Sequence, residues 1–126
     1  GYPWYDVKTA GHQEWVARYI KRGDKTPVLG SIIGYITYLS VAEAIKKAGS
    51  TETPKLVAAF KGLKVETPMG PIMFRAADGQ STMGAWVGTT KIDPQRGVGI
   101  MVNHEYVPGE KVLPTEEEAK KLRPAN

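Results

Sequence analysis

The strongest hydrophobic pattern in the chain runs from Gly34 to Ser50 and predicts a helix over residues 34–48. One apolar stripe recurs at helical spacing: Tyr35, Tyr38, Leu39, Ala42 and Ile45. Four more apolar residues widen this stripe: Ile36, Val41, Ala44 and Ala48. We therefore expect other parts of the protein to cover the helix on more than one side. Two lysines in its last turn suit the helix dipole, and Gly49 is placed to end it in a left-handed conformation.

An earlier helix is predicted over roughly residues 10–22, with Thr9 as its N-cap. Trp15 and Tyr19 are four residues apart and face the same side of such a helix. The run Lys21-Arg22-Gly23 supplies a basic last turn and a glycine stop. Residues 24–31 are then interpreted as a connection that leads into the long helix.

Two further helices are indicated by capping signals. Thr53 is expected to be the N-cap of a third helix, with Pro54 at its first position and Gly62 as its stop. Thr115 and Glu118 have the spacing of a capping box, which predicts a short charged helix near the C-terminus.

From Leu63 the hydrophobic pattern changes from helical to alternating, which predicts three or so antiparallel strands. Alternating positions are Ile72 and Phe74, then residues 83–89, then Val98, Ile100 and Val102. Turns or polar loops are expected between them, at residues 77–79, 91–97 and 107–110. Helices followed by strands predict a mixed α/β fold.

Composition narrows the possible functions. The 126 residues are enough for one small domain, and 41% hydrophobic with 24% charged residues is ordinary for a globular protein. The absence of cysteine excludes disulfides and thiolate metal sites. A net charge of +4 is too weak to argue for nucleic acid as a partner. No apolar run reaches the ~18 residues that a membrane span needs.

Signals for catalysis are absent from the sequence, so no enzyme activity and no cofactor are expected. Gly30-Ser31 and Ser81 do not complete a nucleophile elbow, and Gly97-Val-Gly99 lacks the third glycine of a dinucleotide fingerprint. Only two histidines are present, so no histidine-based metal site is expected. His12 is interpreted as a solvated residue of the first helix.

Two groups of motifs carry a family resemblance. Gly34-Tyr35, the Ala-rich helix and Ala48-Gly49-Ser50-Thr51 resemble a segment of solute-binding proteins of ABC transporters. The runs Gly70-Pro71-Ile72-Met73-Phe74-Arg75 and Asp78-Gly79-Gln80-Ser81-Thr82 resemble a strand pair further along the same family. The chain is most similar to the branched-chain amino acid and amide branch. Relatives often have a larger polar residue where Gly79 stands, which weakens a functional role for Asp78 and Gln80.

The resemblance implies the C-terminal part of a periplasmic protein with a two-lobed type I periplasmic-binding fold. This chain would contribute a fragment of that fold: three helices followed by antiparallel strands and a short C-terminal helix. Residues 1–64 would belong to the first lobe and residues 65–126 to the second lobe. Such a protein captures a small ligand by hinge closure and delivers it to a membrane permease. The family's ligands include amino acids, amides and aromatic acids.

Four residues of this chain are candidates for contacts with a ligand in the cleft: Trp4, Tyr5, Ser31 and Tyr35. The resemblance places the first two near a hinge crossing and Ser31 beside the cleft. Each also has a structural interpretation, and for Ser31 capping of the long helix is favoured. The aromatic residues can equally be packed rings.

The long apolar helix predicts that another protein surface covers part of this chain, because soluble monomers rarely expose large apolar patches. We expect either self-association or contact with an N-terminal part of the same protein. Two alternative functions stay open at this point. The chain could be an independent small α+β module that binds a protein partner, or the ligand-sensing domain of a receptor.

Overall fold

The computed structural model describes residues 2–9, 11–23 and 26–122. Four α-helices, four strands and one short 3₁₀ helix follow in this order: α1 (His12–Lys21), α2 (Leu29–Ala48), α3 (Thr53–Phe60), β1 (Lys64–Thr67), β2 (Gly70–Met73), β3 (Ala85–Asp93), β4 (Val98–Val107), η1 (Gly109–Lys111) and α4 (Glu116–Leu122). The prediction of helices followed by antiparallel strands and a short C-terminal helix is confirmed.

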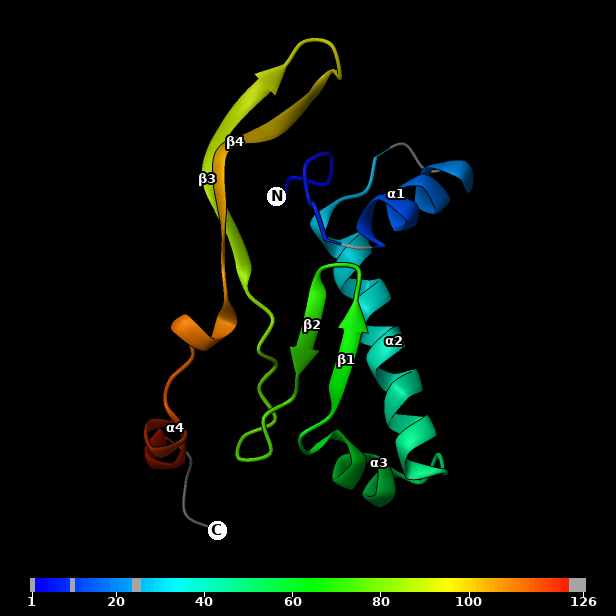
Figure 1. The fold of residues 1–126 in the computed structure, drawn as a ribbon, viewed down its shortest axis with the longest axis vertical. Coiled ribbons are helices and arrows are strands. Elements are labelled where there is room, and N and C mark those ends of the chain that lie inside the picture. The colour runs from blue at the N-terminus through cyan, green and yellow to red at the C-terminus, as the bar shows by residue number, and fades with distance from the viewer. Residues whose placement is uncertain (1, 10, 24–25, 123–126) are drawn as a thin grey trace.

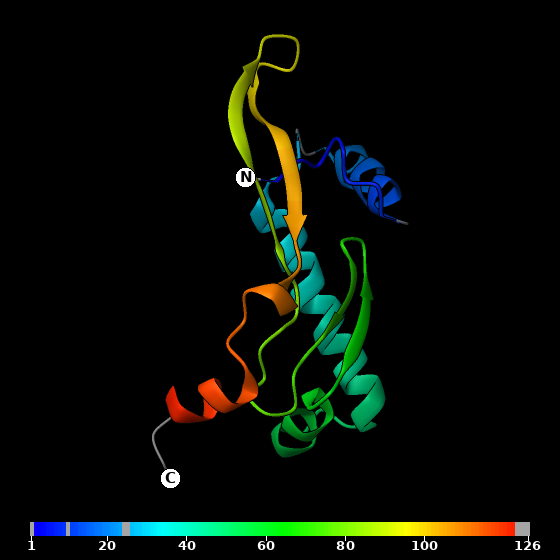
Figure 2. The same ribbon diagram turned by 60° about the vertical axis from the view of Figure 1, so that its left-hand side comes forward.

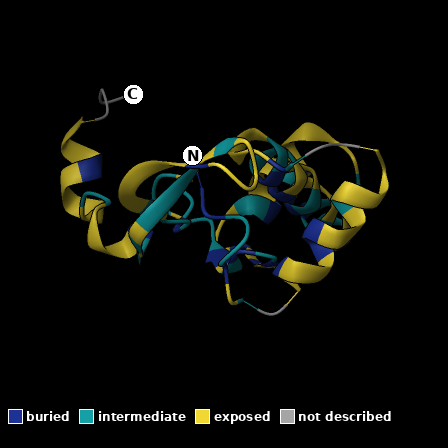
Figure 3. Cartoon of the chain, turned by 90° about the horizontal axis from the view of Figure 1, so that it is seen from above, coloured by how far each residue is buried: buried dark blue, intermediate teal, exposed yellow. Residues whose placement is uncertain are grey.

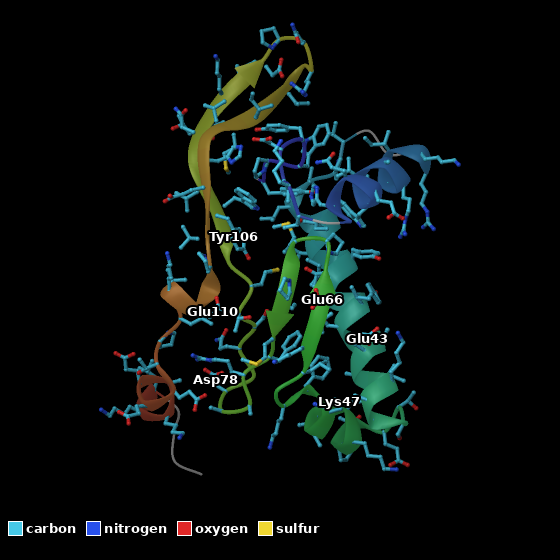
Figure 4. The ribbon with its side chains drawn as sticks, viewed as in Figure 1. Glu43, Lys47, Glu66, Asp78, Tyr106 and Glu110 are labelled. Carbon is cyan, nitrogen blue, oxygen red and sulfur yellow. The ribbon has the colours of Figure 1, made fainter. Side chains whose placement is uncertain are left out.

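Helix α2 runs along the long axis of the molecule with the β1–β2 hairpin beside it (Figure 1). It ends as predicted, because Gly49 has φ 60° and its N–H bonds the carbonyl of Ile45 at 2.8 Å. At this end Lys47 donates to the carbonyls of Ala59, at 2.8 Å, and Lys61, at 3.2 Å (Figure 4). These bonds hold the end of α3 against α2, whose last turn carries the negative end of the dipole.

The buried side of α2 differs from the predicted stripe. Its buried residues are Ile32, Ile36, Ser40 and Ala44, which follow one another at a spacing of four. Tyr38, from the predicted stripe, is 82% exposed, and Tyr35 is 36% exposed. The chain's own core packs against only one side of a helix that is apolar nearly all round. The expectation that α2 is covered on more than one side is therefore not met within the described residues.

Helix starts differ slightly from the sequence-based predictions. Helix α1 begins at His12 with Gly11 at the N-cap position, whereas the predicted N-cap, Thr9, bonds the carbonyl of Pro68 on the β1–β2 turn. Residue 10, the predicted start, lies outside the described residues. In α3 the N-cap position is Glu52, so Thr53 is already helical. Helix α2 begins at Leu29, which moves Ser31 from the predicted connection into the first helical turn.

The described strands form two separate antiparallel pairs, β1–β2 and β3–β4. Hairpin β3–β4 is long, and both views show it extending past the N-terminal segment (Figure 2). The predicted loop 91–97 is wrong in its first half, because β3 continues to Asp93 and only residues 94–97 form the turn. The register shifts between Val87 and Thr89, opposite Asn103 with φ 48°, which marks a β-bulge.

The segment after β2 is tied to the C-terminal region by an ion pair. Arg75 and Asp78 pair in the loop between β2 and β3 (Figure 4), and their side chains are 13% and 4% exposed. Arg75 also donates to the carbonyl of Pro114 at 2.7 Å. These contacts give Asp78 a structural role. The predicted capping box is confirmed, because Glu118 accepts from the N–H of Thr115 at 2.8 Å and donates its own N–H back at 3.2 Å.

The hydrophobic core lies where the N-terminal segment, α1, α2 and the β1–β2 hairpin meet. Its buried members are Tyr2, Val7, Trp15, Val16, Ile32, Ile36, Ala44, Leu63, Val65, Met69 and Ile72. Most of helix α4 and much of hairpin β3–β4 are exposed (Figure 3). The elements that follow β2 therefore contribute less to this core than the elements before it.

His12 is buried, so its interpretation as a solvated residue is wrong. It is fully excluded from solvent, and the Tyr2 ring packs edge-on against it with 5.8 Å between centroids. Neither imidazole nitrogen has a hydrogen-bond partner among the described residues. His12 lies on the buried side of α1 together with Trp15. The sequence pattern around this single histidine did not indicate that it belongs to the buried side. Burial lowers the pKa of His12 below its ordinary value of 6.5.

Acidification is expected to destabilise the fold through His12. As the pH falls below about 6.5, the unfolded chain binds a proton at this residue before the folded chain does, so the free energy of unfolding decreases. His12→Phe removes the titrating group and keeps a ring. We expect urea unfolding between about pH 7.5 and pH 5 to show a shallower pH dependence in the variant. An equal pH dependence of the free energy of unfolding in the two proteins would contradict this prediction. His104 is present in both proteins, so its contribution is the same in each.

Candidate functional site

A pocket of about 240 Å³ lies between helix α1 and the first turns of helix α2. Its lining residues are Trp15, Arg18, Tyr19, Arg22, Ser31 and Tyr35. Trp15 and Tyr19 are four residues apart on α1, and so are Arg18 and Arg22, the C-cap residue, so one face of the helix and its end presents all four. Ser31 and Tyr35 are likewise four apart on α2. Two residues that the sequence nominated, Ser31 and Tyr35, are thus brought together here.

Three aromatic rings form the apolar part of this pocket. Trp15 is 6% exposed and packs against Tyr19, with 5.4 Å between centroids and 34° between ring planes. Tyr35 contacts the other side of the cluster, 6.0 Å from Trp15. Because Trp15 is held by both tyrosines and by the core, its position is well defined before any ligand arrives.

A short hydrogen-bond chain crosses the pocket wall. The Ser31 hydroxyl accepts from the N–H of Val28 at 3.3 Å and donates to the Tyr19 hydroxyl at 2.9 Å. The first of these bonds caps α2, so the favoured interpretation of Ser31 agrees with the structure. The second bond couples the cap to α1 and leaves the Tyr19 proton for another acceptor, since none among the described residues takes it.

Positive charge dominates the electrostatics of the pocket. Arg18 and Arg22 both line it, and the N-terminal end of the 20-residue helix α2 adds its positive dipole end. Glu14 lies 3.8 Å from Arg18, but both side chains are more than half exposed, so this ion pair is weak. Among residues 2–9, 11–23 and 26–122, no carboxylate lines the pocket. The arrangement can hold an anion beside aromatic rings.

Trp4 and Tyr5, the other nominated residues, lie outside this pocket. The Tyr5 hydroxyl bonds both the carbonyl and the N–H of Met101 on β4, the latter at 2.8 Å. The Arg96 guanidinium lies over the Tyr5 ring, 5.3 Å from its centroid. Trp4 is partly buried and packs on the core and on the Tyr5 ring. In this structure both residues join the N-terminal segment to its surroundings, and Tyr5 fastens that segment to hairpin β3–β4.

Sequence reasoning did not nominate four of the lining residues: Trp15, Arg18, Tyr19 and Arg22. The signal was present, because two aromatic and two cationic side chains share one face of the predicted first helix. Nothing in the sequence shows which element that face meets.

Among residues 2–9, 11–23 and 26–122, no three His, Asp or Glu side chains gather as metal ligands would. Within the same residues, none of the helices is long and apolar enough to span a bilayer.

Residues 1–96 match a family model described as periplasmic binding protein. This matched region includes α1, α2, α3, both strands of the first hairpin and β3. It therefore contains the whole lining of the α1–α2 pocket. A search of curated proteins finds no match.

Solved structures with similar folds include three from Rhodopseudomonas palustris. An ABC-type branched-chain amino acid transporter from strain CGA009 has a TM-score of 0.69 and 29% identity over 83% of this chain. An ABC transporter protein has a TM-score of 0.58 and 34% sequence identity over 75% of this chain. A solute binding protein of an ABC transporter from strain BisB5, in complex with 3,4-dihydroxy benzoic acid, has a TM-score of 0.64 and 27% sequence identity over 79% of this chain.

These matches cover 29%, 28% and 28% of the length of the three solved structures, respectively. This chain thus spans less than a third of each of them. The predicted fold class is confirmed at this level: a mixed α/β arrangement that matches part of the periplasmic-binding-protein fold.

Proposed function

Because the chain belongs to the periplasmic binding protein family, we propose that it is part of a solute-binding protein that captures a small ligand for an ABC importer. The observation that carries the proposal is the family match over residues 1–96, which the three solved ABC-transporter proteins support. The family consists of binding proteins and not of enzymes. We propose a periplasmic location and a membrane permease as partner on the same basis.

The ligand classes that we propose are amino acids, amides and aromatic acids. One similar structure is of a branched-chain amino acid transporter, and another contains 3,4-dihydroxy benzoic acid. Ser31 and Tyr35 supply the local share of the ligand contacts in this proposal, because they line the α1–α2 pocket. Trp4 and Tyr5 act at the hinge side, where Tyr5 joins the N-terminal segment to β4.

We also propose that another protein surface covers the exposed side of α2 in the protein at its natural length. Tyr38, at 82% exposed, and Val41, at 38%, lie on the uncovered side of this helix. An N-terminal part of the same protein is the favoured occupant, since the solved relatives are much longer than this chain. Self-association is the alternative, because it would hide the same apolar surface.

The division into lobes at residues 64 and 65 stays a proposal. Val65 and Ile72, from β1 and β2, belong to the same core cluster as Val16 and Ile32 of the helices. We propose that the crossing between lobes comes after β2, because β3 and β4 add only partly buried residues, such as Trp86 and Tyr106, to that core. The exposed hairpin β3–β4 would then contact the second lobe.

The proposal is tested by measuring ligand binding to the protein at its natural length. We expect one class among L-leucine, acetamide and benzoate to raise the melting temperature, because a ligand at 100 times its Kd adds about 2.7 kcal/mol to the free energy of unfolding. Isothermal titration then gives the Kd. A protein that binds no member of the three classes would contradict the proposed function.

A further inference from the structure

The α1–α2 pocket has a chemistry that separates the candidate ligand classes from one another. The described residues line it with two guanidinium groups, three aromatic rings and the Ser31 hydroxyl, and none of them contributes a carboxylate. A free amino acid brings an ammonium group, which needs an acidic or carbonyl partner. A neutral amide brings no charge for the guanidinium groups. Only an anion uses the whole of this lining.

The aromatic part of the pocket narrows the anion to a planar one. Trp15 is nearly fully buried, and Tyr19 and Tyr35 flank it with centroids 5.4 and 6.0 Å away. Flat rings stack or pack edge-on against such walls, and aromatic pairs gain stability beyond the area they bury. The pocket volume of about 240 Å³ is below the ~300–1,000 Å³ of sites for drug-sized molecules, which indicates a single ring.

The hydrogen-bonding groups agree with a carboxylate. Tyr19 accepts from Ser31 at 2.9 Å, which leaves its own O–H group able to donate to a ligand. Arg18 lies on α1, and Arg22, four residues later, is the C-cap residue of that helix, so both can donate to one carboxylate. Their only acidic neighbour in the described ion pairs is Glu14, which is solvent-exposed.

We propose that the α1–α2 pocket binds a single-ring aromatic carboxylate, with Arg18 and Arg22 on the carboxylate, Tyr19 as a further donor, and Trp15 and Tyr35 against the ring. The biological meaning of this site, as part of a solute-binding protein, rests on the proposed function. The binding chemistry itself rests on the pocket.

The probes are benzoate, cyclohexanecarboxylate, benzamide and L-leucine, titrated calorimetrically into the protein at its natural length. We expect benzoate to bind most tightly, because the second probe lacks the aromatic ring and the third lacks the charge. Arg22→Gln and Arg18→Gln are each expected to weaken benzoate about tenfold or more, as loss of a charge-assisted hydrogen bond predicts. Lys21→Gln is the matched control, since it removes a positive charge from α1 outside the pocket lining.

Two further observations support or overturn this assignment. Tyr19→Phe keeps the ring and is expected to weaken benzoate severalfold, while loss of the Ser31–Tyr19 hydrogen bond lowers the melting temperature of the free protein by only a few degrees. Benzoate binding that is unaffected by both arginine substitutions would overturn the inference and leave the proposed function intact. Binding of L-leucine but not of benzoate would also overturn the inference and leave the proposed function intact. Absence of binding by leucine, acetamide and benzoate alike would remove the proposed function as well.

Discussion

Replacing Ile32 by alanine is expected to lower the free energy of unfolding by about 2–5 kcal/mol. Ile32 is fully buried on α2 and belongs to the core cluster with Trp15 and Ile36. Its truncation loses the transfer free energy of the removed atoms and leaves a cavity that a close-packed interior closes only in part. Since small domains are stable by only ~5–15 kcal/mol, this is a large share of the total.

The matched control for this prediction is Ile92→Ala on β3. Ile92 is 75% exposed, so the same atoms are removed where they contribute little, and we expect a change within about 0.5 kcal/mol. Urea unfolding of both variants, at the natural length of the protein, gives the comparison. An equal loss in the two variants would show that Ile92 is covered in the working protein, or that Ile32 is not a core residue.

Gly84→Ala is expected to have the second largest effect, near the upper end of the ~1–3 kcal/mol that overpacking costs. An added Cβ would overlap the carbonyl oxygen of Val107 and lie 2.9 Å from Cα of Pro108. Both atoms are backbone, so no side-chain rotation relieves the clash. The N–H of Gly84 also donates to the Tyr106 hydroxyl at 2.7 Å, a bond that a displaced backbone would lose.

Gly34→Ala serves as the matched control and is expected to have the opposite sign. Gly34 lies inside α2, and an added Cβ there meets nothing within 4 Å. Alanine in a helix interior is more stable than glycine by about 0.5–1 kcal/mol, so this variant should gain stability. Thermal unfolding of both variants is the measurement. A loss of stability in Gly34→Ala would show that this position packs against another surface in the protein at its natural length.

The candidate site was only half accessible to sequence reasoning. Ser31 and Tyr35 were nominated from their place before and within the long helix, and the structure finds both in one pocket. Their partners come from α1, which is separated from α2 by the segment 22–28. Contact between two helices depends on how each packs on a shared core, and no local signal reports that packing. For the same reason Trp4 and Tyr5 were nominated together with Ser31, although they lie elsewhere.

Local signals determined the parts of this protein that depend on neighbouring residues. Helical periodicity predicted α2, the glycine at position 49 predicted its end, and Thr115 with Glu118 predicted the cap of α4. These features need only the contacts between residues a few positions apart, so the sequence contains them completely. The family resemblance likewise depended on short runs of residues in order.

Tertiary structure alone decided which side of α2 is buried. Its sequence is apolar nearly all round, so periodicity could not separate the stripe of Ile32 and Ile36 from that of Tyr35 and Tyr38. The position of the β1–β2 hairpin made that choice. Packing against Tyr2 and Trp15 buried His12, which had been expected to be solvated, and Tyr38 was left 82% exposed. Long-range packing selects among local possibilities that are nearly equal in free energy, and that selection appears only when the whole chain has folded.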